Sequence, residues 1–452
     1  MSDPLHVAVA LDQTGSHPGS WRAPGARPGE LTTAAYWQSL IAVAETGLLD
    51  LVTFTDAFEL HPGPPRTDRA AGRLDSLLLA SRLAPTTGRI GLLPTATAAH
   101  TEPFHVSKAV ATLDFVSGGR AGVVLRTTPD PDEAALFGRR RFPDDPAVLA
   151  ELADEASDFA TVLRLLWDSW EDDAEIRDVT TGRFVDRDKL HYIDFRGTQF
   201  SVRGPSITPR PPQGQPIIAT TAAHAADLPV IGRVADLGFI APRDIDDAMR
   251  AVTAIAEAHH AAGREADDPA IALVDLFVVL GDSRREACER LAQLDEWAGS
   301  PFTPDIVPVV GTAADLADEI EQWLSVDGIR GVRLHPAVLP DDLHAITRDV
   351  VPELQRRNLF REAYDGRSLR GRFVLPRPIN RFTTGKAGVA RASRFTSPST
   401  SLASTTPRSG AIPRPAVRSS STPSCVSRRP PSAGGSTSSS SPRDSGCGSR
   451  TG

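Results

Sequence analysis

The stretch DLVTFTDAFELHPGPPRTDRAAGRLDSLLLASRLAPTTGRIGLLPTATAAH (residues 50–100) contains a strand pattern, a helical pattern and a second strand pattern, in that order. The strands are expected at Asp50–Thr55 and Ile90–Thr95, where apolar and β-branched residues form short runs. Between them, Leu74–Leu83 has apolar residues at three- and four-residue spacing, which is the period of an amphipathic helix. This succession predicts a parallel βαβ unit.

The body of the chain repeats this alternation of short β-branched runs and longer helical patterns. Six further strands are expected at Leu5–Leu11, Gly122–Arg126, Pro216–Thr220, Ala235–Ala241, Ile271–Leu280 and Ile329–Leu334. Further helical patterns cover Thr33–Thr46, Val148–Leu166, Ile245–Ala262 and Ala313–Leu324. Eight strands that alternate with helices predict an α/β fold, a (β/α)8 or TIM barrel. An open doubly wound sheet is the alternative, although no G-x-G-x-x-G follows the first strand, which argues against its dinucleotide-binding form.

Residues 170–215 interrupt the alternation with a polar stretch that contains several Gly and Pro residues, after the fourth predicted βα unit. A loop of this length inside a compact domain is usually functional, so we expect an insertion over the catalytic face of the barrel. A flap that serves only packing or dimerisation is the alternative. The barrel domain, with this insertion, is expected to span residues 1–385.

The last part of the chain, residues 386–452, differs in composition from the rest. It is rich in Ser, Pro, Arg, Thr and Gly, and carries nine Arg and one Lys against a single acid, Asp444. Too few apolar residues remain to offset chain entropy, so we expect this tail to be disordered. The whole chain has 46 Arg and three Lys, which indicates a GC-rich gene. We interpret the tail as a frameshift product or a neutral extension, with nucleic-acid binding as a weaker alternative.

The overall composition excludes several classes of protein. Hydrophobic residues make up 40% and charged residues 23% of the 452 residues, which is enough for a sizeable core. The net charge of −8 leaves an acidic body once the basic tail is set aside, which argues against nucleic acid as the main partner. Three cysteines exclude a disulfide scaffold. No apolar run approaches about 18 residues and no secretory signal is recognised, so we expect a soluble cytoplasmic protein with no membrane partner.

Common motifs for nucleophilic, phosphate-binding and zinc chemistry are missing from the sequence. There is no G-x-S-x-G elbow, no G-x-x-x-x-G-K-[ST] loop, no H-E-x-x-H and no paired C-x-x-C. His100 and His105 are five residues apart, and His259 and His260 are adjacent. Neither spacing places two ligands on one face beside a third, so no metal site is expected.

Polar residues instead follow the carboxyl ends of predicted strands, where barrel enzymes place their sites. They are Asp56, Thr97, His100, Arg126, Thr127, Thr128, Thr220 and Thr221. Each residue alone is typical of a helix cap or a loop. Together they ring one end of the predicted barrel, and we expect the functional site there.

These features resemble the luciferase-like flavin-dependent monooxygenases, in particular the branch of nitrilotriacetate, dibenzothiophene-sulfone and long-chain-alkane monooxygenases. The segments that carry the resemblance are GSWRAP (19–24), LLDLVTFTD (48–56), RIGLLPTATAAHTEPFHVSKAVATLDFVSGGRAG (89–122), LLWDSWEDDAEIRD (165–178), GRFVDRDKLHYIDFRGTQFSVRGPSITPRPPQGQPII (182–218), VVPELQRRNLF (350–360) and LRGRFVLPRP (369–378). They span about residues 5–382, and residues 165–218 are the most specific block. The family normally stops near the LPRP-x-N segment, here Leu375–Asn380, which supports treating the tail as foreign to the fold.

The resemblance implies a barrel that binds FMN at the carboxyl ends of its strands, usually in a dimer. Reduced FMN would come from a separate NAD(P)H-dependent flavin reductase, react with oxygen, and pass one oxygen atom to a small organic substrate. Asp56 matches the acid after the family's second strand, and Thr97 matches a hydroxyl residue beside the flavin ring. The other residues expected here are Thr127, Thr128, Thr220 and Thr221 for cofactor binding, and His100 and Arg126 for catalysis.

The chain departs from the family where the FMN phosphate would bind. The R-Y pair, whose tyrosine reaches the phosphate, falls on Leu152–Ala153, and the Q-A-G-x-S turn that cradles it falls on Ala219–Ala223 without its Gly and Ser. The Asn amide of W-N-V-V-T-S is absent from Val123–Thr128, and S-T-T-Y has become Thr97–His100. Losing two hydrogen bonds to a charged phosphate would cost roughly 3–6 kcal/mol.

Three functional interpretations therefore remain open. The first is an active two-component monooxygenase with an altered flavin pocket, in which Arg126 replaces part of the lost phosphate binding. An Arg126 that only pairs with a carboxylate at the barrel rim is an equal alternative. The second is a family member that has lost catalytic flavin binding and serves as the partner subunit of an active paralogue. The third is a barrel that binds another cofactor, such as a deazaflavin.

Overall fold

The computed structural model describes residues 5–58, 68–143, 145–264 and 268–383. These residues belong to the first of two units of the chain, residues 1–393, and the second unit, residues 394–452, lies outside them. The predicted disorder of the tail at residues 386–452 and its proposed frameshift origin also fall outside the described residues.

Eight parallel strands form a closed barrel. They are β1 (His6–Leu11), β2 (Leu51–Phe54), β3 (Gly91–Thr97), β4 (Gly122–Arg126), β9 (Ile217–Ala222), β10 (Leu237–Ile240), β11 (Ile271–Leu280) and β13 (Ile329–Pro336). Their order is β10-β9-β4-β3-β2-β1-β13-β11, and the pairing of β10 with β11 closes the ring. The predicted TIM barrel is confirmed, with a strand at each of the eight expected places, and the open doubly wound sheet is wrong.

A ninth strand, β12 (Val307–Gly311), was not predicted from the sequence. It pairs in parallel with Leu276–Leu280, the second half of β11, because β10 pairs only with the first half, up to Val274. The run VPVVG is short, contains a proline and is only partly buried, so it lacks the pattern of the barrel strands.

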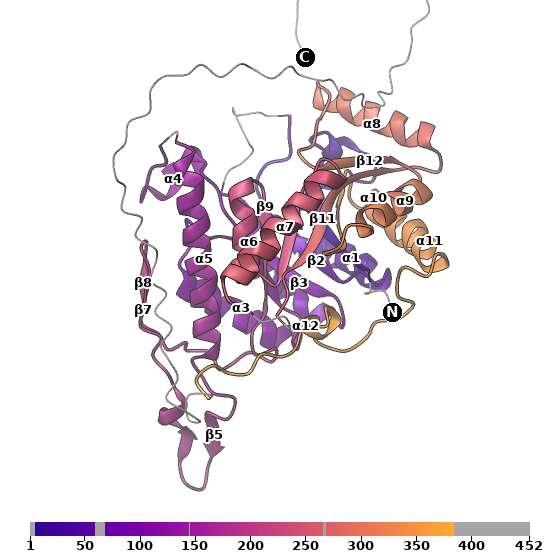
Figure 1. Ribbon diagram of the computed structural model, residues 1–452. Helices are drawn as coiled ribbons and strands as arrows, with labels where there is room; N and C mark the ends of the chain where they lie inside the picture. The colour runs from indigo at the N-terminus through magenta and orange to yellow at the C-terminus, as the bar shows by residue number, and fades with distance from the viewer. Residues whose placement is uncertain (1–4, 59–67, 144, 265–267, 384–452) are drawn as a thin grey trace, which may run out of the picture. The chain divides into compact units, whose positions relative to one another are not determined.

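Helices surround the barrel (Figure 1). They are α1 (Ala34–Thr46), α2 (Ser76–Leu83), α3 (Pro103–Ser117), α4 (Pro131–Phe137), α5 (Ala147–Asp168), α6 (Leu228–Val234), α7 (Ile245–Ala261), α8 (Arg284–Ala298), α9 (Ala313–Leu324), α10 (Asp341–Ala345), α11 (Val351–Arg356) and α12 (Leu369–Arg372). Side-chain caps fix where several of them begin; at α9, for example, Thr312 and Asp315 form a reciprocal capping box. The predicted helical patterns correspond to α1, α2, α5, α7 and α9.

The barrel has an inner and an outer apolar layer, because successive strand residues point to opposite faces. Ala219 and Phe239 belong to the cluster inside the barrel, whereas Ile218 packs outward with residues of α3 and α5. Leu369 and Phe373 join the inner cluster from α12 and its following turn. Since Gly119, just before β4, accepts a hydrogen bond from Leu369 N, α12 closes the barrel at the amino ends of its strands.

The insertion at residues 170–215 does follow the fourth βα unit, but it lies at the amino-terminal face of the barrel, so the prediction that it covers the catalytic face is wrong. It contains two short hairpins, β5 (Glu175–Asp178) with β6 (Arg183–Val185), and β7 (Phe195–Arg196) with β8 (Ser201–Val202). Helix α5 runs back from the carboxyl end of β4, and Figure 1 shows β5 beyond the end of α5 opposite α4. The Gln213 side chain also donates to the carbonyl of Ala121, which precedes β4.

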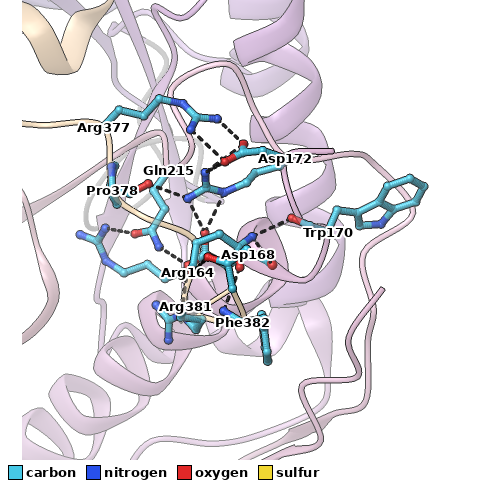
Figure 2. A network of polar contacts seen from close by, with 12 residues as sticks. Arg164, Asp168, Trp170, Asp172, Gln215, Arg377, Pro378, Arg381 and Phe382 are labelled. Carbon is cyan, nitrogen blue, oxygen red and sulfur yellow. Dashed lines mark hydrogen bonds and ion pairs between the residues drawn. The ribbon is translucent and has the colours of Figure 1, made fainter. Parts of the chain in front are cut away.

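The beginning of the insertion is held by a network of ion pairs that we call the amino-end clasp: Asp168, Asp172, Arg210, Arg377 and Arg381. Figure 2 shows Arg377 and Arg381 reaching it from the C-terminal segment. The buried Asp168 carboxylate accepts from Arg210 at 2.9 and 3.1 Å and from Arg381 at 3.0 Å. Asp172 pairs with both Arg210 and Arg377. Two segments that carry the family resemblance, residues 165–218 and the LPRP-x-N segment, therefore contact each other in the fold, for example through Asp172 and Arg377.

Candidate functional site

The carboxyl ends of the strands form the mouth of the barrel and bring several predicted site residues together. Asp56 follows β2, Thr97 ends β3 and Arg126 ends β4, and Thr97 lies opposite Arg126 in the ladder between neighbouring strands. Thr221 lies on the next strand, β9, and its half-exposed side chain is on the inner face with Ala219. The mouth therefore has a continuous polar rim over four adjacent strands.

One predicted cofactor residue, Thr220, does not face the mouth. It alternates with Ala219 inside the barrel and therefore points outward, toward the helices. Its side chain is fully buried, and its hydroxyl has no hydrogen-bond partner among the described residues. The structure therefore does not bring the Thr220 side chain to the mouth with the other predicted residues, because a one-residue step along a strand reverses the side chain.

Asp56 is held at the start of α2. One carboxylate oxygen accepts from Ser76 N at 3.0 Å and the other accepts from Ala57 N at 2.9 Å. Burial raises the pKa of Asp56 above its usual value, against the effect of these hydrogen bonds. A carboxyl group with a raised pKa and a fixed orientation at a barrel mouth is suited to hydrogen bonding with a bound ring.

His100 lies in a cluster of aromatic rings above β3. Its ring stacks on Phe137 with centroids 4.9 Å apart and contacts Phe58 and Phe142 at 6.3 and 5.9 Å. The residue is buried, and Nε2 has no hydrogen-bond partner within the described chain. Burial lowers the pKa of His100, which favours the neutral imidazole at pH 7.

Arg126 is engaged by a carboxylate. Its Nη1 donates to both oxygens of Glu133, at 2.7 and 2.9 Å, and the Glu133 side chain is fully buried at the start of α4. Glu133 also accepts from Phe58 N at 3.3 Å. The structure thus has the alternative for Arg126, a pairing with a carboxylate at the barrel rim. A catalytic role of Arg126 stays a prediction.

A carboxylate occupies the end of the site where the resemblance places the FMN phosphate. Thr127 donates its hydroxyl hydrogen to Asp227 at 2.9 Å, which joins the end of β4 to the turn after β9. The other oxygen of Asp227 accepts from His224 N at 2.8 Å, and Asp227 is buried. Thr128 is occupied too, because its hydroxyl accepts from Asp130 N.

The neighbouring residues do not restore a phosphate site. Leu152 and Ala153 lie buried in α5, so neither can donate a side-chain hydrogen bond. A phosphate needs donors or cations, and Asp227 supplies a negative charge instead. The polar rim of the mouth fits the ring of a flavin, whereas the phosphate end does not fit FMN.

A charged cluster inside the barrel was missed by the sequence analysis. Arg333 of β13 donates to both oxygens of Asp275 on β11, at 2.6 and 2.7 Å, and His335 contacts the same carboxylate at 3.1 Å. Arg333 also donates to Thr221 at 3.3 Å and lies 3.7 Å from the centroid of the Phe239 ring. Burial alone would raise the pKa of Asp275, but Arg333 and His335 lower it to about 2.

This cluster lies under the polar rim and links it to the opposite side of the barrel through Thr221. The available signal was a single acid within the apolar run IALVDLFVVL and a single Arg within IRGVRLHP. A charge inside a buried strand requires a partner. The sequence shows that the buried acid needs a partner of opposite charge, but it does not show which residue is that partner.

The described residues contain neither a metal-binding cluster nor a membrane-spanning helix. No group of three or more His, Cys, Asp or Glu residues there is arranged to hold a metal ion. Likewise, none of the helices within residues 5–58, 68–143, 145–264 and 268–383 has the length and hydropathy needed to cross a membrane.

Comparisons with known proteins agree with this architecture. The family described as "Luciferase-like monooxygenase" matches residues 14–346. N-acetyl-S-(2-succino)cysteine monooxygenase of Bacillus subtilis (strain 168) is 28% identical, covering 84% of this chain and 98% of that protein. Nitrilotriacetate monooxygenase component A of Aminobacter aminovorans is also 28% identical, covering 83% of this chain and 97% of that protein.

Solved structures show the same fold. The crystal structure of a long-chain alkane monooxygenase aligns with a TM-score of 0.74 and 23% identity, over 83% of this chain and 96% of that one. Because the family match covers well over half of the sequence, from the loop after β1 to the end of α10, the relationship does not rest on one motif. The chain is a member of the luciferase-like monooxygenase family.

Proposed function

We propose that this protein is the oxygenase component of a flavin-dependent two-component monooxygenase that acts on a small organic molecule. The observation that carries the proposal is the polar rim at the barrel mouth, where Asp56, Thr97, Arg126 and Thr221 lie on four adjacent strands. Near-full-length similarity to two monooxygenases supports the reaction class.

The cofactor and partners follow from the family. A bound flavin supplies the oxygen chemistry, and the protein supplies position, dryness and hydrogen bonds. Reduced FMN from a separate NAD(P)H-dependent flavin reductase is the family's arrangement, and a cytoplasmic homodimer completes the proposal. Because the phosphate end does not fit FMN, we assign no reaction step to FMN in this chain.

The residues around the mouth have two roles in this proposal. Asp56 is oriented by α2 to bond a polar edge of the flavin ring. Phe58, Phe137 and Phe142 surround His100 and keep water from the region above β3. His100 stays neutral and is the candidate to exchange a proton with the substrate.

An anaerobic titration with reduced flavin, followed by a turnover assay, tests the proposal. The protein is mixed with reduced FMN or reduced riboflavin, and binding is measured by flavin fluorescence and calorimetry. Turnover is then measured with NADH, a flavin reductase, oxygen and three candidate substrates: nitrilotriacetate, N-acetyl-S-(2-succino)cysteine and a long-chain alkane. Micromolar flavin binding and an oxygenated product are expected. Absence of binding up to millimolar concentration of either flavin would overturn the proposal.

A second function is favoured by one observation, the buried Asp227 at the phosphate end. A chain that cannot hold FMN could act as the non-catalytic partner subunit of an active paralogue. In that case the protein should bind no flavin alone, should co-purify with the paralogue when the two are expressed together, and should raise the turnover of that paralogue.

A further inference from the structure

Asp227 is fixed in position by contacts from both sides. It closes the turn Ala225–Asp227 that follows β9, where its carboxylate accepts from His224 N while the His224 side chain accepts from the Asp227 backbone. Thr127, at the end of β4, binds the second carboxylate oxygen. No Arg or Lys forms an ion pair with Asp227 among the described residues, and the residue is only 2% exposed. A carboxylate that has hydrogen bonds but no ion pair thus lies where β4 and β9 end at the mouth.

This carboxylate disfavours the binding of a phosphate group beside it for two independent reasons. An ionised carboxylate and a phosphate dianion are both hydrogen-bond acceptors only, so they cannot bond to each other. Their charges also repel, and the repulsion is stronger at a buried site than in water. Arg126, which precedes Thr127 in the chain, already holds the buried Glu133.

We infer that this site selects a flavin without a terminal phosphate, of which riboflavin is the simplest. The inference rests on the proposed function, since it requires that the mouth bind a flavin ring. A ribityl chain that ends in a hydroxyl is neutral and can donate a hydrogen bond, which matches a surrounding of threonine hydroxyls and one carboxylate. The half-exposed Thr221 side chain belongs to the polar rim, and Thr127, which follows β4, contacts Asp227.

The test compares two ligands that differ only in the phosphate. Reduced and oxidised riboflavin and FMN are titrated into the full-length protein by anaerobic calorimetry. Riboflavin is expected to bind at least about tenfold more tightly than FMN, the order of effect that a single like-charge contact produces. In the Asp227→Asn variant, FMN should bind within about threefold of riboflavin, because Asn removes the charge and keeps an oxygen for His224 N and an amide for Thr127.

Two further variants serve as controls. Asp154→Asn makes the same change of charge at an exposed carboxylate on α5 that pairs with Arg233, and it should leave the ratio of the two affinities unchanged. Asp227→Ser replaces Asp227→Asn should the latter fail to fold, as judged by circular dichroism. FMN binding as tightly as riboflavin in the unmodified protein would overturn this inference and leave the proposed function intact. Failure of both flavins to bind would overturn the inference and the proposed function together.

Discussion

Asp168 in the amino-end clasp and Asp227 at the mouth are both buried carboxylates, but among the described residues only Asp168 is paired with arginines. In the amino-end clasp, Asp168 meets Arg210, Arg381 and the amide of Gln215, so each carboxylate oxygen has at least one donor. At the mouth, Asp227 is buried without a cation, and Nε2 of His100 is buried without any partner among the described residues. The clasp thus pairs its buried carboxylate with cations, whereas Asp227 is held by neutral hydrogen-bond donors only and His100 Nε2 has no donor or acceptor partner among the described residues.

This difference suggests that the clasp serves mainly the stability of the fold and the mouth mainly its function. Unmet polar groups reduce stability, and they persist where a ligand can use them. In TIM barrels, the amino-terminal face commonly supports the fold and the carboxyl face commonly carries the chemistry. We therefore expect substitutions in the clasp to affect mainly folding and substitutions at the mouth to affect mainly binding and turnover.

The largest expected effect on stability is in the clasp. Asp168→Ala should lower the free energy of unfolding by about 3–5 kcal/mol, because the buried Arg210 loses its main counter-charge. Urea denaturation measures the change. Asp172→Ala is the matched control, since Asp172 is half-exposed and its ion pairs should contribute no more than about 1 kcal/mol. Equal losses in the two variants would contradict the distinction between them.

Acid should destabilise both ends of the barrel through two carboxylates. The pKa of Asp275, at the mouth, and of Asp236, at the amino end, is about 2 in each case. Burial opposes ionisation, and it is more than offset by Arg333 and His335 at Asp275 and by Arg164 and Arg370 at Asp236. Because both values lie below the ordinary value of 3.8, each group contributes stability above about pH 4 that is lost as the pH falls toward 2. Each contribution is about 2 kcal/mol.

Measuring the free energy of unfolding from pH 6 to pH 2 checks this dependence. Asp275→Asn and Asp236→Asn should each flatten the decline between pH 4 and pH 2. Asp154→Asn, at an exposed carboxylate, should leave the slope as it is. An unchanged slope in both buried variants would show that other carboxylates carry the acid sensitivity.

A smaller effect is expected at the rim. Arg126→Ala should cost about 1–3 kcal/mol of stability, because the fully buried Glu133 loses its charged donor. It should also weaken flavin or anionic-substrate binding, as measured by calorimetry. In the double variant Arg126→Ala/Glu133→Gln, much of the lost stability should return, but the binding of flavin or anionic substrate should not. Unchanged dissociation constants for both ligands would remove Arg126 from the site.

The smallest effect on stability is expected in the aromatic cluster. His100→Phe should change the free energy of unfolding by no more than about 1 kcal/mol. A phenyl ring can keep the stacking on Phe137, and the buried Nε2 has no hydrogen-bond partner among the described residues to lose. Turnover should fall by about 100-fold if His100 exchanges a proton with the substrate. Unaltered turnover in this variant would leave His100 a packing residue.

The barrel was predictable because its strands are buried and β-branched, so each is visible as a local run of residues. The strand β12 escaped because it borders only half of β11. The position of the insertion was misjudged because the sequence shows that it follows α5 but not that α5 carries the chain back to the amino-terminal face.

The candidate site was predictable only in part. Polar residues at strand ends were visible, and the structure brings Asp56, Thr97, Arg126 and Thr221 to one rim. The direction of Thr220 was not recognised, although strand alternation contains that information. Ion pairing between Arg333 and Asp275, 58 residues apart, appears only when β11 and β13 lie side by side.

By itself, the sequence determined the closed parallel barrel and the family, because each of these is a local pattern of residue types. Only the tertiary structure decided which groups lie together where the resemblance places the phosphate. Thr127 and Asp227 are 100 residues apart, and their contact exists because β4 and β9 are neighbours in the barrel. Whether a buried charge excludes a ligand depends on which groups surround it in space, and closure of the barrel determines those neighbours.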